Sequence, residues 1–305
     1  MKHGILTLYE GNYHLGVGAL INSAVHSGFE GTFLVGYRDA PPPWLAQLER
    51  VREGVYAVGG CELECFRCDP GRHLTYHKPF AALELLEARA ELDTIFYADP
   101  DVLFLAPWAY FEKWVGCGVT LCLDANFPFV GRHHPWRKDW GGIIDRAQLK
   151  TVNTTTRYYN AGFFGLRRKD IGLLKNWAIL TERFEEEGGS TAAMDTANFV
   201  VSVRSDQELL AAAAMTFEDI SEIGQEGMGF NGHYCILSHA VESPKPWVQN
   251  NLRTALAGRG VSVACSLFWD YCEHPILIRS PRALRIKKLS VKLAKLLSRF
   301  YRRPT

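Results

Sequence analysis

Two aspartates, Asp99 and Asp101, flank a proline in the segment TIFYADPDVLFL at residues 94–105. The β-branched and aromatic residues before the pair predict a strand that is buried on both faces and ends at the acidic residues. Pro100 disfavours helix at the residues before it, so both carboxylates are expected on an extended turn. Carboxylates this close repel each other unless a cation lies between them, and protein-bound Mg²⁺ or Mn²⁺ usually completes its coordination with substrate phosphates. The segment therefore predicts a metal site, and the alternative is an ordinary surface turn.

The elements that must position this pair begin with a strand, helix and strand at residues 4–9, 13–26 and 31–36. Connections this short imply two parallel strands joined by a right-handed crossover. Ligands of open α/β sheets bind outside the carboxyl ends of the strands, so the turn at 9–13 is expected beside the ligand. Neither a Gly-x-Gly-x-x-Gly motif nor a P-loop motif is present, which argues against a dinucleotide cofactor and against P-loop chemistry.

The rest of the chain continues to alternate strands and helices. Residues 78–92 predict a helix with Pro79 at its start, and 125–156 predict a long functional loop because the segment is polar but rich in aromatics. The other predicted elements are strands at 118–124, 157–165 and 234–239 and helices at 170–187 and 206–214. This order predicts an α/β protein with a mixed, mostly parallel sheet flanked by helices.

Charged residues are distributed unevenly along the 305-residue chain. Residues 282–305 contain nine of the 34 Lys and Arg residues and no acid, which leaves 25 basic and 33 acidic residues, a net charge of −8, in residues 1–281. We predict one large domain at 1–281 followed by a basic tail at 282–305. A body this acidic is not expected to bind nucleic acid in general.

Compartment and thiol state follow from the same composition. Glu10 interrupts the apolar start too early for a signal peptide, and no run of eighteen apolar residues occurs, so a cytoplasmic protein is expected. The eight cysteines are spread along the chain, which favours reduced thiols over a disulfide framework. A zinc site formed by Cys61, Cys65, Cys68 and His73 is the alternative for the most closely spaced three.

Five sequence blocks occur in a fixed order: LTLYEGNY, HKP, YADPDVLFL, YYNAGFFGL, and SDQELLAA followed by SHAVESPKPW. In this order, from about Ile5 to Trp247, the chain resembles glycosyltransferase family 8 and its relatives with the GT-A fold, which are metal-dependent enzymes that use nucleotide sugars. The resemblance implies roles for individual residues. It implies that the nucleoside lies beside Thr7, Tyr9, Asn12 and Tyr13, and that the metal is bound by Asp99, Asp101 and His239. The donor sugar and diphosphate would lie beside Lys78, and Lys245 would contact the diphosphate. The donor sugar would also contact Asn160, Gly162, Asp206 and Gln207.

The reaction implied by the resemblance is transfer of a hexose from a UDP-sugar to a glycan or lipid-linked saccharide acceptor with retention of configuration. Gln207 would lie near the anomeric carbon, and a divalent ion with a lysine would stabilise the departing diphosphate. Because imidazole is a softer ligand than carboxylate, His239 favours Mn²⁺ over Mg²⁺. Glu242 stands where the family often has glycine, so its side chain is expected to point away from the phosphates. The alternatives are a sugar nucleotidyltransferase and a non-catalytic nucleotide-sugar or glycan-binding module at a membrane surface.

The basic tail carries its own pattern. Ile286, Leu289, Leu293, Leu296, Leu297 and Phe300 recur at helical spacing, and most of the Lys and Arg residues lie off this stripe. The pattern predicts a helix that binds an anionic membrane surface and holds the protein there as a peripheral protein. The alternative is a helix that packs its apolar stripe on the rest of the protein.

Overall fold

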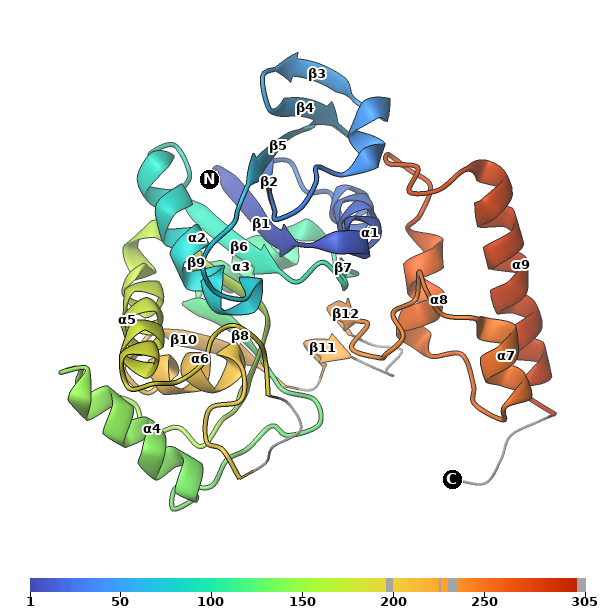
Figure 1. Ribbon diagram of the computed structural model, residues 1–305. Helices are drawn as coiled ribbons and strands as arrows, with labels where there is room; N and C mark the ends of the chain where they lie inside the picture. Colours follow the sequence, from blue (N-terminus) through green and yellow to red (C-terminus); the bar gives the residue numbers. More distant parts are fainter. Residues whose placement is uncertain (196–199, 225, 230–234, 301–305) are drawn as a thin grey trace.

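A large mixed β-sheet runs through the centre of the protein (Figure 1). The computed structural model describes residues 1–195, 200–224, 226–229 and 235–300. The main sheet has nine strands within these residues, in the order β10 (Ile220–Ile223), β8 (Val119–Leu123), β9 (Tyr159–Arg167), β6 (Thr94–Ala98), β1 (His3–Tyr9), β2 (Thr32–Tyr37), β5 (Cys61–Arg67), β4 (Val55–Val58) and β3 (Glu49–Arg52). A smaller sheet has the order β11 (Met228–Gly229), β12 (Leu237–His239) and β7 (Val102–Phe104).

The prediction of a mixed sheet is confirmed, but the prediction that it is mostly parallel is wrong. Parallel pairs join β10 to β8, β6 to β1, β1 to β2 and β2 to β5, whereas the other four neighbouring pairs are antiparallel. One cause is β9, which runs antiparallel between β6 and β8. The other is the connection at 59–60 between β4 and β5, where two glycines with positive φ form a tight turn that only antiparallel strands can share.

Helices cover both faces of the main sheet. They are α1 (His14–His26), α2 (Leu74–Ala88), α3 (Trp108–Gly116), α4 (Pro135–Arg146), α5 (Gly172–Glu186), α6 (Asp206–Ala214), α7 (Asn251–Leu256), α8 (Val263–Asp270) and α9 (Pro281–Leu297), with short 3-10 turns at Gly11–Tyr13, Pro43–Gln47 and Arg168–Asp170. Along β1 the side chains alternate between two apolar cores: Ile5 packs with α1 and α3, and Leu6 packs with α2, α4, α5 and α6. The central strands are therefore buried on both faces, as their sequences predict.

Three predicted elements differ from the structure. The helix predicted at 78–92 is α2, which begins at Leu74 because His73 caps it by accepting a hydrogen bond from the Thr75 amide, and Pro79 lies inside it. The predicted long loop at 125–156 contains α4, whose Trp136, Trp140 and Ile144 are buried. Burial of these large side chains outweighs the low helix propensity of the adjacent glycines 141 and 142. The strand predicted at 234–239 is seen as β12, and residue 234 lies outside the described residues.

The C-terminal part of the described chain forms a group of three helices. α7, α8 and α9 lie beside one another at one edge of the molecule, and Phe268, Leu284 and Val291 join the apolar core on the α1 side of the sheet (Figure 1). Across the described residues, we find no helix with the length and apolar character needed to cross a membrane.

Candidate functional site

A cavity of about 430 Å³ opens where the carboxyl ends of β1 and β6 meet. These strands are parallel neighbours, so the residues that follow them, Glu10 and Asp99, lie at the same edge of the sheet. The antiparallel β9 brings its first residues to that edge, because Phe163 pairs with Ala98. The cavity is lined by Leu8, Tyr9, Glu10, Tyr13, His73, Leu74, Thr75, Lys78, Tyr97, Asp99, Pro100, Asp101, Asn160, Ala161, Gly162, Met194, Ser205, Asp206, Gln207, His239, Val241 and Lys245.

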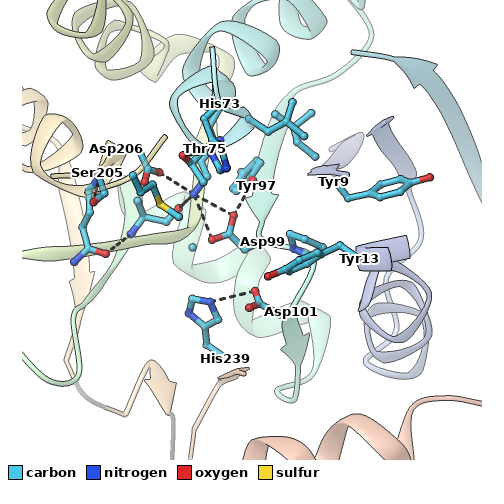
Figure 2. A pocket seen from close by; sticks show the side chains of 18 of the residues that line it. Tyr9, Tyr13, His73, Thr75, Tyr97, Asp99, Asp101, Ser205, Asp206 and His239 are labelled. Carbon is cyan, nitrogen blue, oxygen red and sulfur yellow. Dashed lines mark hydrogen bonds and ion pairs between the residues drawn. The ribbon is translucent and has the colours of Figure 1, made fainter. Parts of the chain in front are cut away.

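The two aspartates and one histidine form a candidate metal centre. β7 follows Asp101 directly, and β12 pairs antiparallel with β7 so that His239 lies opposite Val102. This pairing places the His239 Nε2 atom 3.2 Å from an Asp101 carboxylate oxygen. One ligand atom from each of Asp99, Asp101 and His239 lies within 4.8 Å of the others, a spacing that a single divalent cation can bridge (Figure 2). Two carboxylates and an imidazole suit Mn²⁺ or Mg²⁺, with open positions left for phosphate oxygens.

Asp99 is oriented by donors on both sides. The Tyr97 hydroxyl donates to one carboxylate oxygen at 2.8 Å, and the Lys78 ammonium lies 3.0 Å from the same group. The Asp99 amide donates to the Gly162 carbonyl at 2.8 Å, which continues the ladder between β6 and β9. The backbone of the aspartate predicted from the sequence is thus fixed by the sheet, and its side chain lines the cavity (Figure 2).

Lys78 is the buried cation of the site. The residue is 1% exposed, and its ammonium contacts Asp99 at 3.0 Å, Asp206 at 2.8 Å and the Ala161 carbonyl at 3.0 Å. Burial lowers the pKa of Lys78, but the Asp206 and Asp99 carboxylates outweigh burial, so the pKa lies above its ordinary value. Lys78 therefore stays charged and links α2, β6 and α6 at the back of the cavity.

Asp206 is held at the start of α6 by a capping box. The Ser205 hydroxyl accepts from the Gln207 amide at 3.2 Å, and the Glu208 carboxylate accepts from the Ser205 amide at 2.8 Å. Burial raises the pKa of Asp206 to about 6, since the nearby Lys78 only partly offsets the loss of hydration. The cap thereby explains why Asp206 and Gln207 both line the cavity.

Lys245 contacts the other aspartate of the candidate metal centre. Its ammonium lies 2.6 Å from an Asp101 oxygen and 2.8 Å from the Ala240 carbonyl. Burial raises the pKa of Asp101, but His239 and Lys245 outweigh burial and hold that pKa well below its usual range. Asp101 is therefore ionised at neutral pH and available as a cation ligand.

A further carboxylate, Asp124, which directly follows β8, was not predicted as a site residue. One of its oxygens accepts from the Asn160 side-chain amide at 3.1 Å and from the Gln207 side-chain amide at 3.3 Å. The Asn160 side-chain oxygen, Oδ1, in turn accepts a hydrogen bond from the Gly162 backbone amide at 2.9 Å. Asp124 thus fixes two of the predicted sugar-contacting side chains. Its position at the carboxyl end of the predicted strand at 118–124 was the signal that could have identified it.

The four residues expected around a nucleoside do not all reach the cavity. Tyr9 and Tyr13 line it, although the Tyr9 hydroxyl donates to the Ala40 carbonyl at 2.6 Å. Thr7 and Asn12 are not among the lining residues. Thr7 is buried within β1, two residues before the end of the strand, and the Asn12 side chain accepts from the Trp247 indole at 3.3 Å. The tyrosine rings are therefore the surfaces available on this side of the cavity.

The remaining lining residues refine the sequence-based picture. Thr75, Met194 and Val241 line the cavity without a predicted role, and His73, which also lines it, had a predicted role only in the alternative zinc site. Glu242, which stands where the family often has glycine, does not line the cavity. Of the described residues, only Asp99, Asp101 and His239 form a group of three spaced for metal binding, so the zinc alternative at the cysteines has no structural support. All eight cysteines are free thiols.

Comparison of the sequence with models of protein families gives no match, and comparison with curated proteins gives none either.

Proposed function

We propose that this protein is a metal-dependent glycosyltransferase with a GT-A fold, which transfers a hexose from a UDP-sugar to a glycan or lipid-linked saccharide acceptor with retention of configuration. The observation that carries the proposal is the convergence of Asp99, Asp101 and His239 with two lysines at one cavity. The GT-A assignment is supported by the parallel β1–α1–β2 unit and by the acidic pair that directly follows β6.

The charge of the cavity supports a ligand that binds together with a cation. Its lining contains four acidic side chains and two lysines, a formal charge of −2 when the histidines are neutral. A diphosphate would be repelled by such a lining, whereas a divalent ion on Asp99, Asp101 and His239 would bring the lining to neutrality. We therefore expect nucleotide binding to require the ion.

The chain's own residues supply binding and orientation. When bound, the divalent ion would stabilise the negative charge of the departing UDP. Lys245 can turn its ammonium from Asp101 to a phosphate oxygen once the cation neutralises that carboxylate. Lys78 stays between Asp99 and Asp206 and keeps both carboxylates in place.

The donor sugar is assigned to the side of the cavity formed by Asn160, Gly162 and Gln207. Asp124 holds both amide side chains there, and Gln207 would lie near the anomeric carbon. Asp206 is committed to the ion pair with Lys78 and is not placed as a covalent nucleophile. In a retaining reaction without such a nucleophile, the leaving phosphate oxygen would accept the proton of the attacking hydroxyl.

The direct test measures UDP released from a panel of UDP-sugars, with glycan and lipid-linked saccharide acceptors, in Mn²⁺ and in excess chelator. We expect release that depends on the metal and on one donor. Metal-dependent UDP binding without release in any combination would support the non-catalytic binding module instead. Pyrophosphate formation from UTP and a sugar 1-phosphate would identify a sugar nucleotidyltransferase. Either result would refute the proposed reaction.

A further inference from the structure

The last described helix, α9, packs on the protein through one face only. Leu284, Val291 and Ala294 are buried, and they recur at helical spacing along the side that meets α7 and α8. Lys287 lies on the same side, where its ammonium reaches the Gln249 carbonyl at 3.4 Å. The helix is thereby held in a fixed orientation by its neighbours, and its other face is directed outward (Figure 1).

The outward face is apolar. Four large side chains of α9 at helical spacing are between 43% and 59% exposed, namely Ile286, Leu289, Leu293 and Leu296, and Phe300, in the turn just after the helix, is 78% exposed. At 100° per residue this stripe lies opposite the buried face, so no rotation of the helix in place could bury both. A continuous exposed apolar row on a folded protein marks an interaction surface more often than a chance arrangement.

A row of cations borders the stripe. Arg285 and Lys292 are seven residues apart, which places them on one line along α9, and Arg299 continues the same spacing in the turn just after the helix; all three are exposed. In the described part of the chain they take part in no ion pair, unlike Lys288, which pairs with Glu273 at 3.1 Å. The row therefore has unpaired positive charge to offer to a partner that contacts the stripe.

We propose that α9 docks on an anionic lipid bilayer, with its axis parallel to the surface, the apolar stripe in the headgroup and acyl boundary, and the cationic row against lipid phosphates. The charge of the segment selects this partner. Residues 282–305 contain nine basic and no acidic residues, so a second copy of the stripe would bring like charge against like charge. A bilayer supplies both an apolar layer and anionic groups at its edge.

The fold favours docking because the helix is already formed. Ser280 caps α9 by accepting from the Ala283 amide at 3.4 Å, and Pro281 occupies the first helical position. Contacts with α7 and α8 then fix which face points outward. The bilayer would therefore meet a preformed amphipathic surface and would not have to induce a helix in an unfolded segment. This inference does not depend on the transferase activity proposed above.

The test measures partition of the full-length protein onto vesicles of phosphatidylcholine alone and onto vesicles with added phosphatidylglycerol, at low and high salt. We expect binding to the anionic vesicles that weakens as salt rises. Neutralising the row with Arg285→Gln, Lys292→Gln and Arg299→Gln should lower the partition coefficient on the order of 100-fold, because each basic residue near an anionic surface contributes about a factor of five. As a control, Lys138→Gln, Lys150→Gln and Lys175→Gln make the same charge change at exposed positions elsewhere.

A second variant tests the stripe. Leu289→Ser, Leu293→Ser and Leu296→Ser should abolish vesicle binding without changing the midpoint of urea unfolding, because these side chains are exposed in the folded protein. The matched control is Val51→Ser, Val152→Ser and Ile179→Ser, at exposed apolar positions away from α9. Failure of the wild-type protein to bind anionic vesicles would overturn the proposal. So would equal binding by the row variant and its control, or a self-association that the stripe variant abolishes while no vesicle binding occurs.

Discussion

Replacing Asp101 with asparagine separates the two roles that the site gives to this carboxylate. One Asp101 oxygen lies 2.6 Å from the Lys245 ammonium, and another lies 3.2 Å from His239 Nε2. Asparagine keeps the shape but removes the charge that pairs with Lys245. We therefore expect Asp101→Asn to lower the free energy of unfolding by about 1–3 kcal/mol without metal, the cost of losing a hydrogen bond to a charged, mostly buried group.

Mn²⁺ adds the second, diagnostic effect. At a hundred times its dissociation constant a ligand of the folded state raises the free energy of unfolding by about 2.7 kcal/mol. The wild-type protein should gain this increment, and Asp101→Asn should gain almost none because it loses an anionic ligand. The difference between the two proteins should therefore widen from about 1–3 to about 4–6 kcal/mol when metal is added.

Urea unfolding followed by fluorescence, in excess chelator and in Mn²⁺, measures both effects. Lys245→Gln is the matched variant, because it breaks the same ion pair but leaves all three ligands, so it should lose stability in chelator and keep the Mn²⁺ increment. Asp145→Asn changes an exposed carboxylate on α4 and should leave both values unchanged. An equal Mn²⁺ increment in wild type and Asp101→Asn would refute the metal assignment.

Three further predictions address other parts of the structure. Gln207→Ala should lower the transfer rate more than it weakens UDP binding, because its proposed contact is with the sugar; lower UDP affinity at an unchanged saturated rate would contradict that placement. Asp124→Ala should have the same kinetic pattern, since it releases the Asn160 and Gln207 amides, and an unchanged rate would show that they need no such support. Burial lowers the pKa of His77 to about 4. The neutral side chain therefore contributes fully to the free energy of unfolding above its unfolded pKa of about 6.5, and this contribution is lost as pH falls through about 4. Between pH 7 and pH 4 this loss should reach about 3 kcal/mol. The His77 ring stacks on Phe80, and its buried Nδ1 atom has no partner in the described structure, so His77→Phe should remove this pH dependence from urea unfolding curves. An unaltered pH dependence in that variant would contradict the assignment.

The aspartate pair could be predicted from the sequence because its chemistry is local. The strand, the proline and both carboxylates lie within twelve consecutive residues. His239 is different, because only its pairing opposite Val102 in the small sheet brings it to Asp101. No periodicity or spacing between residues so far apart specifies that register. The sequence-based assignment of His239 therefore depended on resemblance to a family, and the strand pairing supplies its physical basis.

The contacts of Asp124 depend on a still less predictable feature. β8 and β9 pair with a register shift between Leu121 and Cys122, after which Cys122 lies opposite Asn160. Irregular register bends a strand and redirects the side chains that follow it. The regular alternation used to interpret strands gives no indication of such a shift. Asp124 could be placed at the end of a strand from the sequence, but its hydrogen bonds to two amides could not.

For the C-terminal helix, the sequence does not specify which face is buried, because it contains two apolar faces. The predicted stripe of Ile286, Leu289 and Leu293 is the more hydrophobic, and burial of apolar area alone would favour packing that face on the protein. The structure instead buries the face that contains Leu284 and Ala294. Small side chains such as Ala294 permit close approach to neighbouring helices, whereas burying the stripe would draw the adjoining cationic row toward the protein interior, where desolvation is costly. The bulkier face stays outside together with its charged border, and a membrane surface is an environment that would accept both.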